Sequence, residues 1–205
     1  MLNHTIRDHL PDHVTLIAVS KNQSDEKIQS ALDAGYRQFG ENRVQEAVSH
    51  WQEHRATYPD LTLHLIGPLQ SNKVKQAVAL FDVIQTVDRP KIAKALADEM
   101  VAQQRLLPCF IQINIGNEEQ KSGIALADAK AFYHYCVNDL GLNIIGVMAI
   151  PPFDEPAMPY FQQMKSLGDH LGVTQFSMGM SDDYQDAIAC GATHVRVGTA
   201  LFGTR

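Results

Sequence analysis

The sequence predicts a single (β/α)₈ barrel that spans residues 1–205. Eight short apolar segments alternate with segments that carry apolar residues at helical spacing. The strand segments are apolar on both faces, as in a parallel sheet covered by helices, and eight such units are the number that closes a barrel. The main alternative is an open doubly wound sheet, which carries a glycine-rich fingerprint after its first strand. No such fingerprint follows Val19, Ser20 and Lys21.

Four strand–helix units are predicted in the first half of the chain. The apolar run TLIAVSK predicts a strand over 15–21, and the next helix begins after Ser24 as N-cap and ends at Gly35. Three further strands are expected over residues 36–39, 63–67 and 83–87. The helices after them are indicated by the apolar residues Val44, Ala47, Val48 and Trp51, by Val74, Ala77, Val78 and Phe81 after a start at Ser71, and by the segment from an Asp88 cap through Met100.

The second half repeats this pattern four times. Strands are expected over residues 109–115, 143–150, 175–180 and 194–198. Between them, helices are indicated by inward-facing Phe132 and Cys136, by the stripe Phe161, Met164, Leu167 and Leu171, and by the segment from Ser181 to Cys190 that Gly191 ends.

Composition excludes several classes of protein. Of the 205 residues, 45% are hydrophobic and 20% charged, and the formal net charge is −6. This charge argues against nucleic-acid binding, because no basic stripe is available for phosphates. No apolar stretch is long enough to cross a membrane, and the first residues lack the apolar core of a signal peptide. Three cysteines without a close pair predict reduced, buried thiols, so we expect a cytoplasmic protein.

Closure of the barrel would bring the carboxyl ends of the strands to one mouth, where proteins of this fold keep their sites. The side chains expected there are Lys21, Asn42, Asn114, Met148, Ser177 and Arg196. A lysine at a strand end is either solvated without a role or desolvated and nucleophilic toward a carbonyl carbon. The rest of the mouth favours the second interpretation for Lys21.

Parts of a phosphate site follow the last two predicted strands. Gly179 loosens the turn, Ser181 is expected to cap a helix whose free N–H groups point at the mouth, and Gly198 and Thr199 let backbone amides approach a ligand closely. Each feature alone also has a structural explanation, as a helix cap or a tight turn. Together, on adjacent strands, they are typical of phosphate binding in such barrels.

A lysine across the mouth from a phosphate site suggests a ligand with an aldehyde at one end and a phosphate at the other. Pyridoxal 5′-phosphate (PLP) is such a ligand, and its ring nitrogen needs a partner. Arg196 shares the inward face of its strand with Gly198 and could reach the ring. Because an arginine stays charged, it would donate to an unprotonated pyridine nitrogen and weaken the electron sink. The alternative role for Arg196 is an ion pair that lines the barrel.

Six segments of the chain resemble the pyridoxal phosphate homeostasis proteins, over nearly all of the sequence from Leu16 to Gly203. They are LIAVSK, FGENRVQEA, HLIGPLQSNK, INIGNEEQKSG, GVMAIPP and FSMGMSDDYQDAIACGATHVRVGTALFG. The resemblance implies a barrel like that of alanine racemase, an aldimine at Lys21 and Arg196 at the pyridine nitrogen. It also implies further cofactor contacts, at Asn42, Met148, Ser177, Ser181, Gly198 and Thr199.

We therefore expect a PLP-binding protein rather than an enzyme. It would hold PLP as a lysine aldimine, maintain PLP homeostasis inside the cell and pass the cofactor to apo-enzymes, as a monomer. The alternative is a PLP-dependent enzyme similar to an amino-acid racemase, which needs a second acid or base opposite the lysine. Its relatives supply a tyrosine from an added β domain of a partner chain, a domain we expect to be absent because the sequence ends at Arg205. A Schiff-base aldolase would use Lys21 without a partner at Arg196.

One competing motif is the H-x-x-E-H pattern of zinc peptidases, formed by His50, Glu53 and His54. The predicted helix buries Val44 and Trp51, which leaves both histidines to the side of its apolar stripe and away from the mouth. We expect a solvated helix end here and no metal site.

Overall fold

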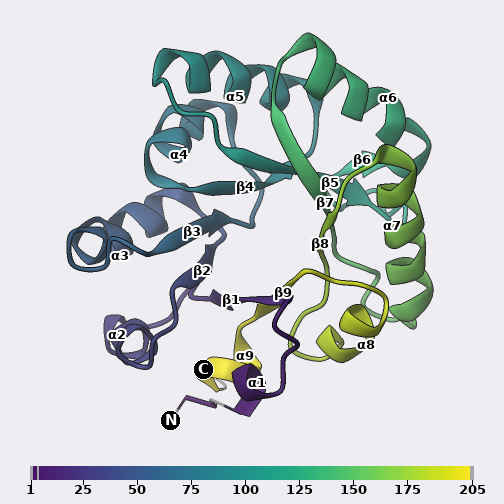
Figure 1. Ribbon diagram of the computed structural model, residues 1–205. Helices are drawn as coiled ribbons and strands as arrows, with labels where there is room; N and C mark the ends of the chain where they lie inside the picture. Colours follow the sequence, from purple (N-terminus) through teal and green to yellow (C-terminus); the bar gives the residue numbers. More distant parts are fainter. Residues whose placement is uncertain (1, 4, 204–205) are drawn as a thin grey trace.

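Eight parallel strands close into a barrel in the computed structural model, which describes residues 2, 3 and 5–203 (Figure 1). These strands are β1 (Thr15–Val19), β2 (Gln38–Glu41), β3 (Thr62–Leu65), β4 (Val83–Val87), β5 (Pro108–Asn114), β7 (Asn143–Ala149), β8 (Gln175–Ser177) and β9 (His194–Val197). They pair in this order, and β9 returns to pair with β1. The predicted (β/α)₈ barrel is therefore confirmed, while residues 1, 4, 204 and 205 of the predicted domain lie outside the described residues.

Helices surround the barrel and connect its strands. They are α1 (Thr5–Asp8), α2 (Asp25–Asp33), α3 (Val44–Thr57), α4 (Val74–Leu80), α5 (Pro90–Ala102), α6 (Ala129–His134), α7 (Met158–Leu171), α8 (Tyr184–Ala189) and α9 (Thr199–Phe202). Shorter turns precede or extend them, namely the 3₁₀ helices η1 (Ser71–Lys73) and η2 (Leu126–Asp128) and the π-helix η3 (Tyr135–Asp139). The predicted Ser24 cap is confirmed, since its hydroxyl accepts a hydrogen bond from the Lys27 N–H.

Only the strand predicted over 83–87 has the bounds seen in the structure, and the differences at two of the other strands have a clear physical cause. The strand expected over 36–39 lies at β2, two residues later, because the Tyr36 N–H still donates to the Ala31 carbonyl in the turn that ends α2. The strand expected over 175–180 ends at Ser177, and the chain then turns at Gly179 with φ 92°.

The predicted Asp88 cap is wrong. Helix α5 begins after Arg89, and the Asp88 carboxylate instead forms an ion pair with the Arg89 guanidinium at 2.6 Å. Three short elements were not expected from the sequence: α1, α9 and the two-residue strand β6 (Ile124–Ala125), which pairs with the end of β5.

The apolar core lies mainly between the strands and the surrounding helices. Most side chains predicted for it are buried, including Val44, Ala47 and Trp51 of α3. Val48 and Leu167 are only half-buried. All three cysteines are free; Cys109 and Cys136 are buried as predicted, whereas Cys190 is partly exposed.

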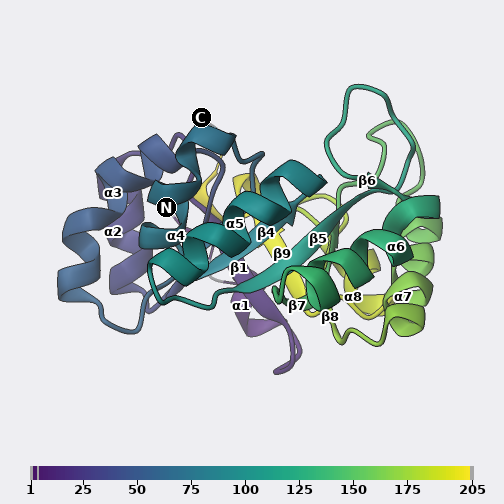
Figure 2. The ribbon, with the colours of Figure 1, turned by 90° about the horizontal axis from the view of Figure 1, so that it is seen from above.

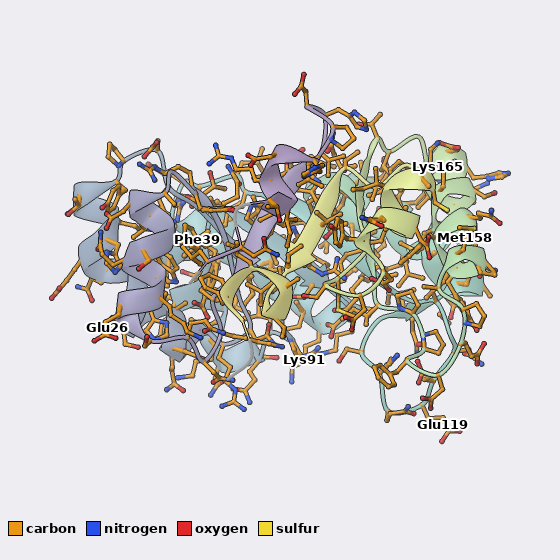
Figure 3. All side chains as sticks on the ribbon, turned by 90° about the horizontal axis from the view of Figure 1, so that it is seen from below. Glu26, Phe39, Lys91, Glu119, Met158 and Lys165 are labelled. Atoms are coloured by element: carbon orange, nitrogen blue, oxygen red, sulfur yellow. The ribbon has the colours of Figure 1, made fainter. Side chains whose placement is uncertain are left out.

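The two ends of the barrel differ in what covers them. Figure 2 shows α1 at one edge of the molecule and the loop between β5 and β6 at the opposite edge. In Figure 3, Lys91 at the start of α5 and Glu119 of that loop lie toward the same end, the end at which the strands finish. This end is the mouth of the barrel. Within the described residues, no helix has both the length and the apolar character needed to cross a membrane.

Candidate functional site

Lys21 lies two residues beyond the end of β1, at the barrel mouth as predicted. The Ser20 N–H still donates to the Gly40 carbonyl of the neighbouring strand at 3.1 Å, and Asn22 then turns the chain with φ 56°. The Lys21 side chain is half-buried. Within the described part of the chain, no hydrogen bond or ion pair engages its Nζ atom, so the amine is available to a ligand.

Two carboxylates hold the residues on either side of Lys21, one through a side-chain hydroxyl and one through a backbone N–H. The Ser20 hydroxyl donates to Glu41 Oε1 at 2.7 Å, and the Asn22 N–H donates to Glu46 Oε1 at 2.6 Å. Burial raises the pKa of Glu41, which is fully buried, against the opposing effect of its hydrogen bonds. The lysine therefore projects from a segment whose position is fixed by residues of β2 and α3.

Arg196 lies on β9 with only 4% of its surface exposed. Its Nη1 donates to Ser177 Oγ at 2.8 Å and its Nη2 to the Ala149 carbonyl at 2.9 Å. Burial lowers the pKa of Arg196 to about 10, so the guanidinium remains protonated at neutral pH. No carboxylate of the described residues forms an ion pair with it, which removes the alternative role considered from the sequence.

A chain of hydrogen bonds continues from Arg196 through the barrel interior. The Ser177 hydroxyl donates to Gln85 Oε1 at 2.6 Å, a bond that spans the barrel because β8 and β4 are not neighbours. Gln85 Nε2 contacts His64 Nδ1 at 3.1 Å. His64 Nε2 contacts Gln38 Oε1 at 2.9 Å, and Gln38 Nε2 donates to Thr62 Oγ1 at 3.2 Å. Burial lowers the pKa of His64 to about 3, so this ring is neutral and can accept at Nδ1 while donating at Nε2.

The structure corrects the predicted role of Ser181. Helix α8 begins after Asp183, so Ser181 is not its cap. Its hydroxyl instead accepts a hydrogen bond at 3.2 Å from the N–H of Ala200, in the first turn of α9. Because Gly198 and Thr199 form the start of α9, this bond brings the three predicted phosphate residues together at the ends of β8 and β9.

The other predicted mouth residues differ in their surroundings. Asn42 directly follows β2, so close to Gly67 that a Cβ atom there would lie 2.3 Å from the Asn42 carbonyl oxygen. Met148 is fully buried on β7 within a small apolar cluster of the barrel. The side-chain amide of Asn114 donates to the Glu118 carbonyl at 2.8 Å, and it therefore organises the β5–β6 loop.

The H-x-x-E-H segment is not the solvated helix end that we expected. His50 is largely buried, and its Nδ1 lies 3.5 Å from Glu41 Oε1. His54 is half-buried and its ring lies 5.7 Å from that of Trp51. Among the described residues, the groups close enough to share a metal ion are His50, Glu41 and Glu46, which are not the ligands of the zinc-peptidase pattern.

Sequence reasoning assigned no role to Glu41, Glu46, His64 or Gln85. A signal existed for Glu41, because a glutamate at the end of a buried strand requires a partner. No comparable signal marks Gln85, whose partner Ser177 lies 92 residues away in the sequence.

The groups at the mouth fit PLP by their chemistry. A free amine suits an aldehyde, and hydroxyl and backbone N–H groups at the ends of β8 and β9 suit a phosphate. Arg196 has five N–H donors, and its hydrogen bonds to Ser177 and Ala149 leave the others for a ring nitrogen.

Comparisons with known proteins agree with this assignment. The family model of the alanine racemase N-terminal domain matches residues 4–205. The chain is 41% identical, over 95% of its length and 87% of the relative's, to the pyridoxal phosphate homeostasis protein of Escherichia coli K12. It is 42% identical, over 94% of its length and 85% of the relative's, to the protein of the same name from Haemophilus influenzae.

Solved structures show the same relationship. PipY of Synechococcus elongatus, determined without PLP, is 39% identical and has a TM-score of 0.91 over 97% of both chains. The structure of PipY with PLP bound is 38% identical, with a TM-score of 0.89 over 97% of both chains. An alanine racemase of Clostridium difficile shares the fold at 13% identity, with a TM-score of 0.80 over 98% of this chain and 55% of that one. This chain belongs to the pyridoxal phosphate homeostasis protein family, whose barrel is that of the alanine racemase N-terminal domain.

Proposed function

We propose that this protein binds PLP at the barrel mouth and holds it covalently on Lys21. The Nζ amine would condense with the aldehyde carbon of PLP, form a carbon–nitrogen double bond and release water. The observation that carries the proposal is the free amine of Lys21 at the end of β1, in a chain closely related to a protein solved with PLP bound. The hydrogen bonds that hold Ser20 and Asn22, on the two sides of Lys21, support a role for the lysine in positioning the cofactor.

In this proposal the remaining residues bind the other parts of PLP. Arg196, oriented by Ser177, donates to the ring nitrogen. The backbone and hydroxyl groups of Ser181, Gly198 and Thr199 bind the phosphate, and Asn42 and Met148 lie beside the ring. All of these residues come from one chain, so a monomer is sufficient for binding.

We propose further that the protein stores PLP and passes it to apo-enzymes, without turnover of a substrate. A guanidinium that stays charged keeps the ring nitrogen unprotonated, and an unprotonated ring is a poor electron sink for carbanion chemistry. The names of the relatives, which describe homeostasis, support the same conclusion.

Reduction with borohydride tests the covalent site. The purified full chain is incubated with PLP, its visible absorbance is recorded, and the reduced protein is digested for peptide mapping. We expect the label on Lys21 and its loss in Lys21→Ala. Lys121→Ala is the matched control, because the Lys121 amine already donates to the Pro151 carbonyl at 3.0 Å. A label on Lys73 or Lys121 in the parent protein would refute the assignment.

The second candidate function is amino-acid racemisation, which the fold shared with alanine racemase favours. The loaded protein is incubated with amino acids in deuterated water, and separately with an apo-transaminase. We expect reactivation of the transaminase without α-proton exchange. Exchange at enzyme-like rates would instead support the racemase.

A further inference from the structure

A cavity lies beside the predicted cofactor site, between the ends of β2, β3 and β4. Its volume is about 620 Å³, within the range of small-molecule sites. It is lined by Asn42, Arg43, Val44, Gln45, Pro68, Leu69, Gln70, Lys73 and Arg89. Of the residues considered for PLP, Asn42 is the one that belongs to this lining.

The lining is strongly cationic. It contains three positively charged side chains, Arg43, Lys73 and Arg89, and no carboxylate. The whole sequence, by contrast, has 17 basic and 23 acidic residues and a net charge of −6. Asp88 pairs with Arg89 from behind the lining, so Arg43 and Lys73 are the cations whose charge no carboxylate offsets, in a chain that is acidic overall.

Two of these cations are free and the third is fixed in place. Within the described residues, no hydrogen bond or ion pair engages the Arg43 or Lys73 side chain. Arg89 is held by Asp88 at 2.6 Å and by the Leu69 carbonyl at 2.9 Å, so its guanidinium is positioned before any ligand binds. Such an arrangement reduces the entropy lost on binding.

The backbone adds to the positive potential. The cavity includes Val44 and Gln45, the first residues of the 14-residue helix α3. The side chain of the N-cap residue, Arg43, makes no hydrogen bond to the first N–H groups of the helix. These groups are therefore not occupied by the N-cap side chain and add positive potential to the cavity. The helix end thus adds to the evidence for an anion site, which rests mainly on the cavity and its three cationic side chains.

We propose that this cavity binds a small anion with two or more negative charges, such as a polycarboxylate or a phosphate ester. Arg43, Lys73 and Arg89 pair with the anionic groups. The amides of Gln45 and Gln70 orient the ligand, and Val44, Pro68 and Leu69 contact its carbon skeleton. The proposal goes beyond PLP binding, because it needs neither Lys21 nor Arg196.

Calorimetric titration of the full chain with citrate at low ionic strength tests this site. The titration uses the parent protein, with and without PLP, and the variants Lys73→Gln and Arg43→Gln. Lys91→Gln is the matched control, since it removes the same charge from an exposed position at the same end of the barrel but outside the lining (Figure 3). We expect saturable binding of one citrate, weakened about tenfold by each lining variant and little changed by the control.

Several results would overturn the proposal. The first is the absence of saturable binding. The second is an equal loss of affinity in Lys91→Gln, which would indicate general attraction to the protein surface. The third is loss of citrate binding when the protein is loaded with PLP, which would place the anion in the cofactor's phosphate site. A polyglutamate peptide that binds more tightly than citrate, with the same dependence on Lys73, would assign the cavity to an acidic protein surface instead. None of these results affects the borohydride label on Lys21, so the two proposals fail independently.

Discussion

The side chains that connect Arg196 to Thr62 all donate hydrogen bonds in the same direction. Because the guanidinium can only donate, Ser177 must accept from it and donate onward to Gln85 Oε1. The amide of Gln85 then has its Nε2 toward His64, which receives it at Nδ1 and donates from Nε2. Bonds aligned in this way polarise one another, so the orientation of Arg196 depends on residues across the barrel.

The substitution Gln85→Leu tests the contribution of this chain of hydrogen bonds, because leucine has a similar volume to glutamine but no polar group. Gln85 is fully buried, so leucine would leave the Ser177 hydroxyl without its acceptor and His64 Nδ1 without its donor. Unsatisfied buried groups cost about 1–3 kcal/mol each, and we expect a loss of this order in the free energy of unfolding, measured with urea. The control is Gln162→Leu on the exposed face of α7, expected within about 0.5 kcal/mol of the parent. Equal stability of both variants would mean that the chain of bonds contributes nothing.

Residues at strand ends were the ones that sequence reasoning could place. Lys21 follows a clear apolar strand, and Arg196 is the last residue but one of another, so the rule that sites form at strand ends predicted the position of both at the mouth. His64 and Gln85 could not be identified, because a polar residue within a strand acquires its partner only when the barrel closes. Ser181 was assigned to the wrong helix, because its hydrogen bond goes to Ala200, 19 residues away.

At the scale of elements, α7 packs against β8 through a glycine. A Cβ atom on Gly168 would lie 2.2 Å from Phe176 Cε1, and the Phe176 ring is itself buried. The helix therefore approaches the strand more closely than any larger residue at this position would allow. This contact sets the position of β8, which carries Ser177.

The substitution Gly168→Ala has two opposite effects on the free energy of unfolding, one from helix propensity and one from packing. Alanine within a helix is favoured over glycine by about 1 kcal/mol. Overpacking of a buried contact costs about 1–3 kcal/mol, so we expect a net loss of roughly 1 kcal/mol in urea unfolding. Ser166→Ala on the exposed face of the same helix is the control, and it should gain a few tenths of a kcal/mol. A more stable Gly168→Ala variant would contradict the close packing.

Element types were predicted better than element ends. The β4 bounds match the prediction, since a wholly buried strand has an uninterrupted apolar run. Strand β2 was misplaced because its buried Glu41 resembles the start of a loop. The short helices α1 and α9 contain too few residues for a helical pattern to be detected.

At the scale of the whole molecule, the barrel has an apolar outer layer and a polar interior. The large apolar cluster joins the outer faces of the strands to the helices, whereas inside the barrel only Val83, Phe110 and Met148 form a separate cluster among the described residues. The interior polar groups must keep their protonation states for the hydrogen bonds to persist. Stability of the fold should therefore depend on pH.

His64 gives this dependence a definite sign. Burial lowers its pKa in the folded state to about 3, from an ordinary value of 6.5. Between these values the unfolded chain binds the proton that the folded chain excludes, so stability is present above pH 6.5 and is lost as the pH falls, by about 1.4 kcal/mol per pH unit. His194, whose pKa burial lowers to about 4, acts in the same direction. Glu41 and Asp88, whose pKa values burial raises, act in the opposite direction at acid pH.

His64→Asn isolates the contribution of this one ring, because the asparagine oxygen can replace Nδ1 as acceptor for Gln85 but does not titrate. We expect the variant to be less stable at pH 7, since it loses the bond to Gln38 and leaves space in the barrel. As the pH falls from 6.5 toward 4, its free energy of unfolding should decline less steeply than that of the parent, by about 1.4 kcal/mol per pH unit. Above pH 6.5 the two curves should run parallel, which serves as the internal control. Urea unfolding across this range measures both slopes, and parallel curves at acid pH would show that His64 is not the excluded proton site.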